Sequence, residues 1–132
     1  KAELKESLKT KSDWLKETQA VFNEYIRERD KFYGCISCGT FNGKKNAGHY
    51  RSTAACPELR FEEANVHLQC EHCNTYLSAN LIEYRKHLII KMGVETVEWI
   101  ESKHEPKKYT ILELIELKVK YKDKIKSLKS TT

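Results

Sequence analysis

Two short stretches decide the fold, Cys35-Ile36-Ser37-Cys38 and Cys70-Glu71-His72-Cys73, which share one C-x-x-C spacing. Each pair can present two thiolates from a single tight turn, and zinc prefers thiolate ligands in tetrahedral geometry. Two such pairs in one chain favour a shared metal ion over disulfides or a redox dithiol. We therefore predict a structural zinc ion bound by all four cysteines, which would close residues 39–69 into a loop.

Composition places the chain among ordinary globular proteins. Its 132 residues are 39% hydrophobic and 33% charged, which suits one soluble domain with a small core and solvated helices. No apolar run approaches the roughly 20 residues that span a bilayer, so we expect a cytoplasmic protein without a membrane partner. Because the chain begins at Lys1, we expect it to be a piece of a longer protein. The fifth cysteine, Cys56, is interpreted as a buried small residue.

Helical patterns flank the cysteine segment. Residues 2–31 predict one long helix, or two, with an apolar stripe that includes Leu4, Leu8, Leu15, Phe22, Tyr25 and Phe32. Between the cysteine pairs, the residues around Phe41 and those at 47–51 suggest a short hairpin, and residues 52–64 suggest a loop. We divide the chain into an N-terminal helical extension (1–33), a zinc-binding core (34–105) and a basic C-terminal helix (106–132).

Three further signals define the helices after the second cysteine pair. Asn80 followed by Glu83 resembles a helix cap, and Gly93 is a helix stop before a short helix over residues 94–102. Thr110 and Glu113 form a predicted capping box that opens the last helix.

The charge is basic and unevenly distributed. The net charge is +5 with a pI near 8.9, which fits a nucleic-acid partner without proving one. Residues 118–129 contain six lysines, among them Lys118 and Lys122, against one acid. They form either a solvated helix face or a strip that contacts phosphates. The Lys44-Lys45 pair is a second candidate DNA contact.

Several polar residues near the cysteine pairs are not needed by a zinc site alone. Phosphodiester hydrolysis needs a base with a pKa near neutral, a divalent ion and cations for the flanking phosphates. His49 could be the base and Asn74 an ion ligand, although asparagine also caps helices well. Asn65 could orient the histidine or tie the loop. Arg51 and Arg60 could contact phosphates, or could instead pair with the acids at 58, 62 and 63.

These residues follow the order of a known family. The pattern Cys-x-x-Cys, Gly-His, Asn, Cys-x-x-Cys-Asn resembles the HNH subset of the ββα-metal nucleases. A more specific resemblance is to the NinG (Rap) recombination endonucleases of lambda-like bacteriophages. It rests on Ala47-Gly48-His49-Tyr50-Arg51-Ser52, on Leu59-Arg60-Phe61, on Asn65-Val66-His67-Leu68-Gln69-Cys70 and on Cys73-Asn74, and it covers about residues 34–105.

The resemblance implies an endonuclease for branched recombination intermediates such as Holliday junctions and D-loops, active in the host bacterial cytoplasm. His49 takes the general-base position, Asn65 the middle asparagine that braces the loop, and Asn74 the ligand of a catalytic magnesium or manganese ion. The cysteines take the structural zinc positions. The implied fold is α+β and mainly helical, with a zinc-stapled ββα-metal (HNH-like) core between long flanking helices.

One position departs from the pattern. Many HNH enzymes have an acidic ion ligand just before the base histidine, where this chain has Gly48. We expect His67 to replace that ligand, with Glu62 and Glu63 as weaker candidates. Imidazole ligation would favour manganese or another transition ion over magnesium.

Two other functions compete with the nuclease. The first is a zinc-binding DNA-recognition module without catalysis, and the second is a structural domain that binds a partner through its helices. A homodimer is expected if the substrate is a two-fold junction that needs two cuts.

Overall fold

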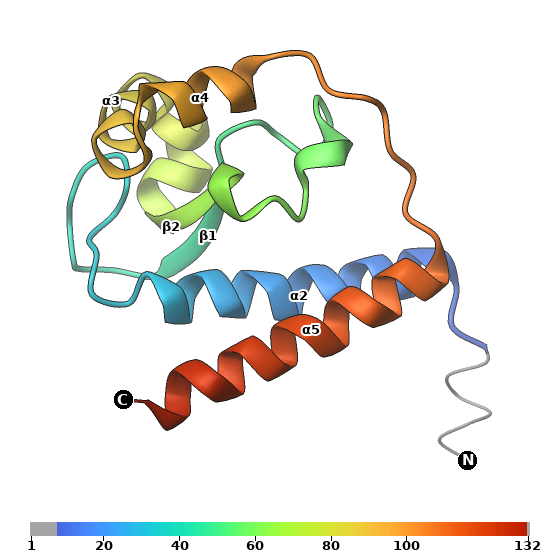
Figure 1. Cartoon of the computed structure of the whole chain (residues 1–132). Coiled ribbons are helices and arrows are strands. Elements are labelled where there is room, and N and C mark those ends of the chain that lie inside the picture. Colours follow the sequence, from blue (N-terminus) through green and yellow to red (C-terminus); the bar gives the residue numbers. More distant parts are fainter. Residues whose placement is uncertain (1–7, 132) are drawn as a thin grey trace. The chain divides into compact units, whose positions relative to one another are not determined.

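The computed structural model describes residues 8–131. The chain is mainly helical with one small sheet, and its elements are α2 (Lys11–Arg29), β1 (Lys45–His49), β2 (Val66–Cys70), α3 (Leu81–Met92), α4 (Val94–Glu101) and α5 (Ile111–Ser130) (Figure 1). The mainly helical α+β class is therefore confirmed. The chain divides into two compact units, Lys1–Tyr25 with Tyr109–Thr132, and Ile26–Lys108. Residues 26–33 of the expected N-terminal extension thus belong to the second unit, and α2 contributes to both.

The first unit is a helix pair built by apolar packing. Phe22 of α2 and Tyr121 of α5 are buried, and their rings meet edge to face with centroids 4.8 Å apart. The Thr18 hydroxyl, fully buried in the seam, donates a hydrogen bond of 2.9 Å to the Leu114 carbonyl. The predicted capping box is confirmed, since the Thr110 and Glu113 side chains bond each other's backbone N–H groups.

The sheet of the second unit joins segments that are distant in sequence. β1 and β2 are antiparallel, with Lys45 opposite Cys70 and His49 opposite Val66. The predicted hairpin partner around Phe41 is wrong, because Phe41 lies outside the strands with 62% of its surface exposed. Every residue of β2 is buried, so β2 offers β1 a far better partner surface than the exposed segment around Phe41 does.

Helices α3 and α4 contribute four of the seven buried residues in the main apolar cluster of the second unit. Tyr84, Leu88, Val97 and Ile100 are fully buried and pack with a smaller group from the cysteine segment that includes Cys56. That group confirms Cys56 as a buried residue. The loop between the strands contains two 3₁₀ turns, Pro57–Leu59 and Glu63–Asn65.

The helix boundaries confirm one sequence signal and correct another. Gly93 ends α3 with a φ of +90°, as expected. Asn80 is not a side-chain cap: its backbone is left-handed, and its Nδ2 points to the Cys73 sulfur at 3.6 Å. The preceding chain forms a turn of π-helix (His72–Tyr76) and a 3₁₀ turn (Ser78–Asn80), so the helix expected from Asn74 onward begins regularly only at Leu81.

The apolar stripe of the N-terminal segment is shorter than expected. Leu8 is 72% exposed and Phe32 is 81% exposed, because α2 begins at Lys11 and ends at Arg29. Leu4 lies outside the described residues. Within the part of the chain that the structure describes, no helix combines the length and apolar character needed to cross a membrane.

Candidate metal centre and the residues around it

The four paired cysteines converge as predicted. The sulfur atoms of Cys35, Cys38, Cys70 and Cys73 all lie within 4.8 Å of one another, and the sulfurs of Cys38 and Cys70 are 3.8 Å apart. Four sulfurs about 2.3 Å from a tetrahedral zinc ion would be separated by about 3.8 Å. The site can therefore hold a structural metal ion such as zinc.

The backbone around the cysteines also suits a metal. The Cys38 N–H points to the Cys35 sulfur at 3.5 Å, and the Cys73 N–H points to the Cys70 sulfur at 3.4 Å. Burial alone would raise the pKa of the Cys35 thiol, but N–H groups directed at its sulfur lower it to about 7. Burial raises the pKa of Cys73 to about 12. Loading this site with zinc would accordingly release protons.

His49 ends β1 in a half-buried position. Its Nε2 lies 3.0 Å from the Arg60 carbonyl oxygen, which can only accept, so Nε2 carries the hydrogen and Nδ1 has the lone pair. Among the described residues Nδ1 has no hydrogen-bond partner. Burial lowers the pKa of His49, the hydrogen bond to the Arg60 carbonyl opposes this, and the Arg60 charge lowers the pKa further. The lowered pKa favours the neutral imidazole, whose Nδ1 lone pair has no partner among the described residues.

Asn65 braces the loop that follows His49. Its side chain is fully buried and bonds both backbone groups of Arg51, with Oδ1 accepting from the N–H at 2.8 Å and Nδ2 donating to the carbonyl at 3.0 Å. Nδ2 also donates to the Leu59 carbonyl at 3.2 Å. The Asn65 backbone carbonyl accepts from the Tyr50 N–H. Of the two roles the sequence left open, tying the loop is the one these contacts perform.

His67 is not available to an ion. It is fully buried, and its Nε2 lies 2.8 Å from the Ala64 carbonyl oxygen. Its Nδ1 lies 2.9 Å from the Lys91 ammonium and 3.2 Å from the Arg29 guanidinium, both of which are paired with buried Asp30. Burial and these two cations lower the pKa of His67 to about 3. Both ring nitrogens are engaged, which corrects the expectation that His67 replaces the missing acidic ligand.

Position 48 is closed to side chains. A Cβ atom added to Gly48 would lie 1.9 Å from Oε1 of Gln69, which faces it from the neighbouring strand. An acidic ligand at this position would therefore collide with a fully buried glutamine. Among residues 8–131, the grouped Cys, His, Asp and Glu side chains that could hold an ion are the four cysteines. Around His49, the described residues therefore do not form a group of three or more such side chains that could hold a catalytic ion.

The remaining candidates fall in varied surroundings. Asn74 lies inside the π-helical turn, where Glu71 is the N-cap, so the capping alternative is wrong for it. Its half-buried side chain makes no hydrogen bond to the described residues.

The two candidate arginines differ in their contacts. Arg51 donates to the Ile100 carbonyl at 3.0 Å, whereas the buried Nε of Arg60 has no hydrogen-bond partner among the described residues. The alternative in which these arginines pair with the acids at 58, 62 and 63 stays a prediction.

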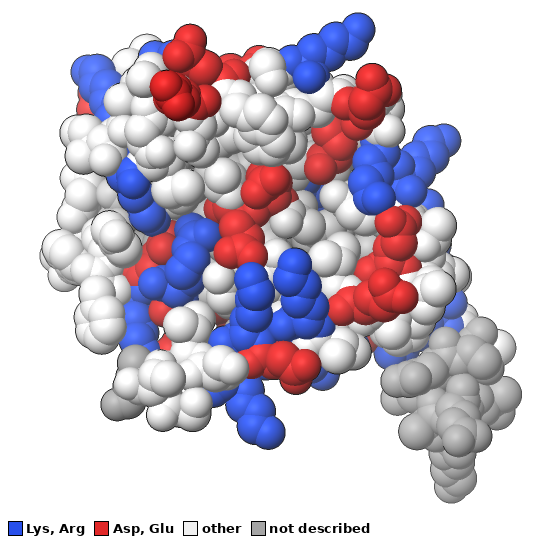
Figure 2. Space-filling view, viewed as in Figure 1, with Lys and Arg blue, Asp and Glu red and all other residues white. Residues whose placement is uncertain are grey.

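The lysine candidates are less distinctive. Lys44 pairs with Glu71 at 3.3 Å, Lys118 pairs with Glu17 at 2.8 Å, and Lys45 and Lys122 are exposed. Figure 2 shows basic and acidic side chains interspersed on the face in view. A continuous basic surface does not emerge there, so these lysines remain predictions.

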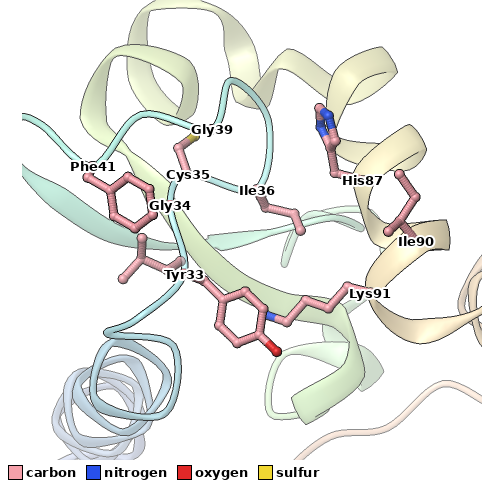
Figure 3. Close-up of a pocket in the computed structure, with 10 residues that line it drawn as sticks. Tyr33, Gly34, Cys35, Ile36, Gly39, Phe41, His87, Ile90 and Lys91 are labelled. Atoms are coloured by element: carbon pink, nitrogen blue, oxygen red, sulfur yellow. The ribbon is translucent and has the colours of Figure 1, made fainter.

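A pocket of about 460 Å³ opens beside the first cysteine pair (Figure 3). Its walls include Tyr33, Ile36, Phe41 and Ile90, and the Lys91 ammonium lies 4.3 Å from the Tyr33 ring centroid. His49, Asn65 and Asn74 are not among the lining residues. The pocket is therefore separate from the candidate reaction site.

Sequence reasoning missed two groups of residues. Arg29 and Asp30 form the buried network behind β2, with the Asp30 carboxylate also accepting from the Leu68 N–H at 3.1 Å. In the sequence, this network is indicated only by Arg29, a charged residue that interrupts the apolar stripe of its helix. Gln69 gave a weaker signal, as a polar residue within an apolar strand segment.

These features define a mainly helical α+β protein with a four-cysteine centre that can bind a structural metal. The chain belongs to the NinG family, since the family model described as "Bacteriophage Lambda NinG protein" matches residues 1–131. It is 47% identical over 126 residues to the ninG proteins of Escherichia phage lambda and Escherichia phage 933W, and 45% identical to that of Salmonella phage P22. These matches cover 95% of this chain but only 62–63% of the relatives, so the chain spans less than two thirds of their length. No solved structure matches.

Proposed function

We propose that this chain is the core of a structure-selective DNA endonuclease of the HNH type. It would hydrolyse phosphodiester bonds in branched recombination intermediates such as Holliday junctions and D-loops. The observation that carries the proposal is the His49 imidazole at the end of β1: its pKa is lowered, one nitrogen is anchored to the Arg60 carbonyl, and the other has no partner among the described residues. That is the arrangement a general base requires.

Arg60 supports the endonuclease proposal as a candidate group for binding the DNA substrate. Its charge lies close enough to His49 to lower the pKa of the imidazole, and its buried Nε lacks a hydrogen-bond partner. A guanidinium beside a candidate base can bind a phosphate oxygen through charge-assisted hydrogen bonds from its terminal nitrogens. Arg60 would thus bind a DNA phosphate beside the base.

The reaction follows from these two groups. His49 Nδ1 accepts a proton from a water molecule as the water oxygen attacks the phosphorus. The bond from phosphorus to the departing oxygen breaks, and solvent water protonates that oxygen. Arg60 stabilises the negative charge on the phosphate, and Asn65 keeps the loop that carries Arg60 in place. A zinc ion at the four cysteines would hold the ends of this segment together.

The decisive experiment compares cleavage of a labelled four-way junction with cleavage of a linear duplex, in magnesium or manganese. We expect wild type to cut the junction preferentially. His49→Ala should lower the rate at least about 100-fold, since general bases typically contribute 10²–10⁴. Zinc content and junction binding should be unchanged. His104→Ala, in the loop after α4, is the matched control and should cut like wild type.

The closed position at Gly48 favours a second function, a zinc-binding DNA-recognition module without catalysis. Tight junction binding with no cutting in either metal, by wild type as well as by His49→Ala, would support this module and rule out the nuclease. A junction with two-fold symmetry would engage two copies of the chain, so the stoichiometry of the complex tests the homodimer as well.

A further inference from the structure

The pocket beside the first cysteine pair has a buried apolar floor and an exposed apolar rim. Ile36 and Leu68 are buried in its floor, whereas Tyr33, Phe41 and Ile90 are each more than half exposed. In Figure 3, Phe41 lies on one side of Ile36, and Ile90 of α3 lies on the other. Large apolar side chains that stay exposed around a cavity of about 460 Å³ are typical of a binding site.

Both aromatic rings of the rim are available to a planar ligand. The Lys91 ammonium lies 4.3 Å from the centroid of the Tyr33 ring, so it covers one face of that ring and leaves the other open. Neither Tyr33 nor Phe41 stacks on another ring among the described residues. Aromatic side chains pack well against flat π-systems, so the two rings favour a ligand with a planar aromatic group.

The polar groups of the pocket also fit such a ligand. Lys91 is the one Lys, Arg, Asp or Glu in the lining, and its partner Asp30 is not a lining residue. His87 adds an imidazole whose Nδ1 is buried without a partner among the described residues, so Nε2 is the ring atom left to a ligand. A lysine and an imidazole can donate to the acceptor atoms on the edge of a nucleobase.

Positive charge continues along the loop that carries Phe41. Lys44 and Lys45 follow it after three and four residues, and both are exposed. Lys44 also pairs with Glu71 at 3.3 Å. An apolar protein segment would not need these cations, whereas a base is attached to phosphates that lysines attract. The charge therefore favours a nucleic-acid ligand for the pocket.

We propose that this pocket binds one unpaired DNA base, which stacks on Tyr33 and Phe41, and that it thereby distinguishes DNA with unpaired bases from fully paired duplex. Zinc-knuckle modules and aromatic platforms bind single strands through such contacts. The inference rests on the proposed function because its ligand is DNA, and it names the feature of branched DNA that is recognised. A D-loop offers unpaired bases in its displaced strand. Cleavage is not required.

The test compares the affinities for two DNAs without added magnesium or manganese. One is a fully paired duplex, and the other is the same duplex with a short single-stranded gap. Zinc-loaded protein is titrated against each by fluorescence anisotropy at one fixed salt concentration. We expect wild type to bind the gapped DNA more tightly. Tyr33→Ala and Phe41→Ala should each lose at least about fivefold in affinity for the gapped DNA, because base stacking is lost, and should bind duplex as before.

Three further variants separate stacking from general damage. Phe32→Ala is the matched control, because Phe32 is an exposed aromatic residue beside Tyr33 that does not line the pocket. It should bind both DNAs like wild type. Tyr33→Phe keeps the ring and should also bind like wild type, whereas Tyr33→Leu should resemble Tyr33→Ala. Zinc content and melting temperature check the folding of each variant. Phe41→Ala keeps the test decisive if a change beside Cys35 disturbs the metal site.

The inference and the proposed function can fail separately. Unchanged affinity of both alanine variants for gapped DNA would overturn the inference and leave the pocket to an apolar protein segment. An equal loss for gapped and paired DNA would overturn it as well. A selective loss for gapped DNA, together with no cutting of any junction by wild type, would reject the endonuclease and leave the base-binding pocket standing.

Discussion

The two compact units of the chain are stabilised by different means. In the helix pair formed by the N-terminal part of α2 with α5, burial of large side chains such as Phe22, Leu114 and Tyr121 provides the stability. In the unit Ile26–Lys108, a two-stranded sheet and short helices meet around four cysteines and a buried polar network. A helix pair loses stability gradually as contacts are removed, whereas the second unit depends on a few groups that must all be satisfied.

Removal of the metal should produce the largest contrast between the units. Structural zinc sites contribute on the order of 10 kcal/mol to folding, so a chelator should unfold the sheet and α3–α4. We expect the α5 amides, which lie in the helix pair, to retain much of their protection. Hydrogen exchange with and without chelator measures this.

A cysteine control sharpens the same experiment. Cys73→Ser should abolish binding of one zinc per chain, whereas Cys56→Ala should retain it, because Cys56 is a core residue and not a ligand. Equal protection of the second unit before and after complete metal removal would show that its packing suffices without the ion.

Acid should weaken the second unit through His67. Burial and the charges of Lys91 and Arg29 lower its folded-state pKa to about 3, against an ordinary value of 6.5. Above pH 6.5 the residue is neutral in both states. As the pH falls from 6.5 to 3, the unfolded chain gains a proton that the folded chain refuses, which costs about 1.4 kcal/mol per pH unit.

The measurement is urea unfolding of wild type and His67→Gln between pH 7 and 4.5. The free energy of unfolding of wild type should fall faster with decreasing pH, and His104→Gln should follow wild type. Asp30 contributes separately at lower pH: its pKa is lowered from 3.8 to about 2, so its stabilisation is lost only across that interval. Parallel curves for wild type and His67→Gln would show that His67 titrates normally in the folded protein.

The smallest expected change in the free energy of unfolding comes from a substitution in the helix pair. Thr110→Ala removes the capping box of α5 and should cost about 1 kcal/mol in urea unfolding, with zinc affinity unchanged. Thr131→Ala, at the exposed end of the same helix, should change stability by less than about 0.5 kcal/mol. A loss of zinc after Thr110→Ala would mean that the two units are not independent.

The sequence predicted correctly those features of the fold that depend only on neighbouring residues. The C-x-x-C spacing, the capping box at Thr110 and the stop at Gly93 each depend on a few neighbouring residues, and all were found as expected. The prediction that Asn80 caps α3 with its side chain was wrong, because contacts from outside the helix determine the conformation of its turn. The sulfur of Cys73 and the bonds that Ser37 and Gln69 make to Ala79 hold that turn in a left-handed conformation.

The candidate site was predicted only in part for the same reason. Nothing near His67 in the sequence shows that Lys91, Arg29 and Asp30 will surround it, because these residues come from α3 and from the end of α2. Nor does the sequence reveal that Gln69 fills the space beside Gly48, since that contact depends on strand register. Spacing identifies groups capable of chemistry, but tertiary packing decides which of them remain free.

The braced loop after His49 also affects how the protein can evolve. Because Asn65 fixes its two ends at Arg51 and Leu59, the residues between them are anchored independently of their own number. Lengthening such a segment costs little, about 0.6 kcal/mol for each doubling. Insertions there could therefore accumulate across a lineage and reshape what the protein recognises, while the strands and the metal-binding turns stay as they are.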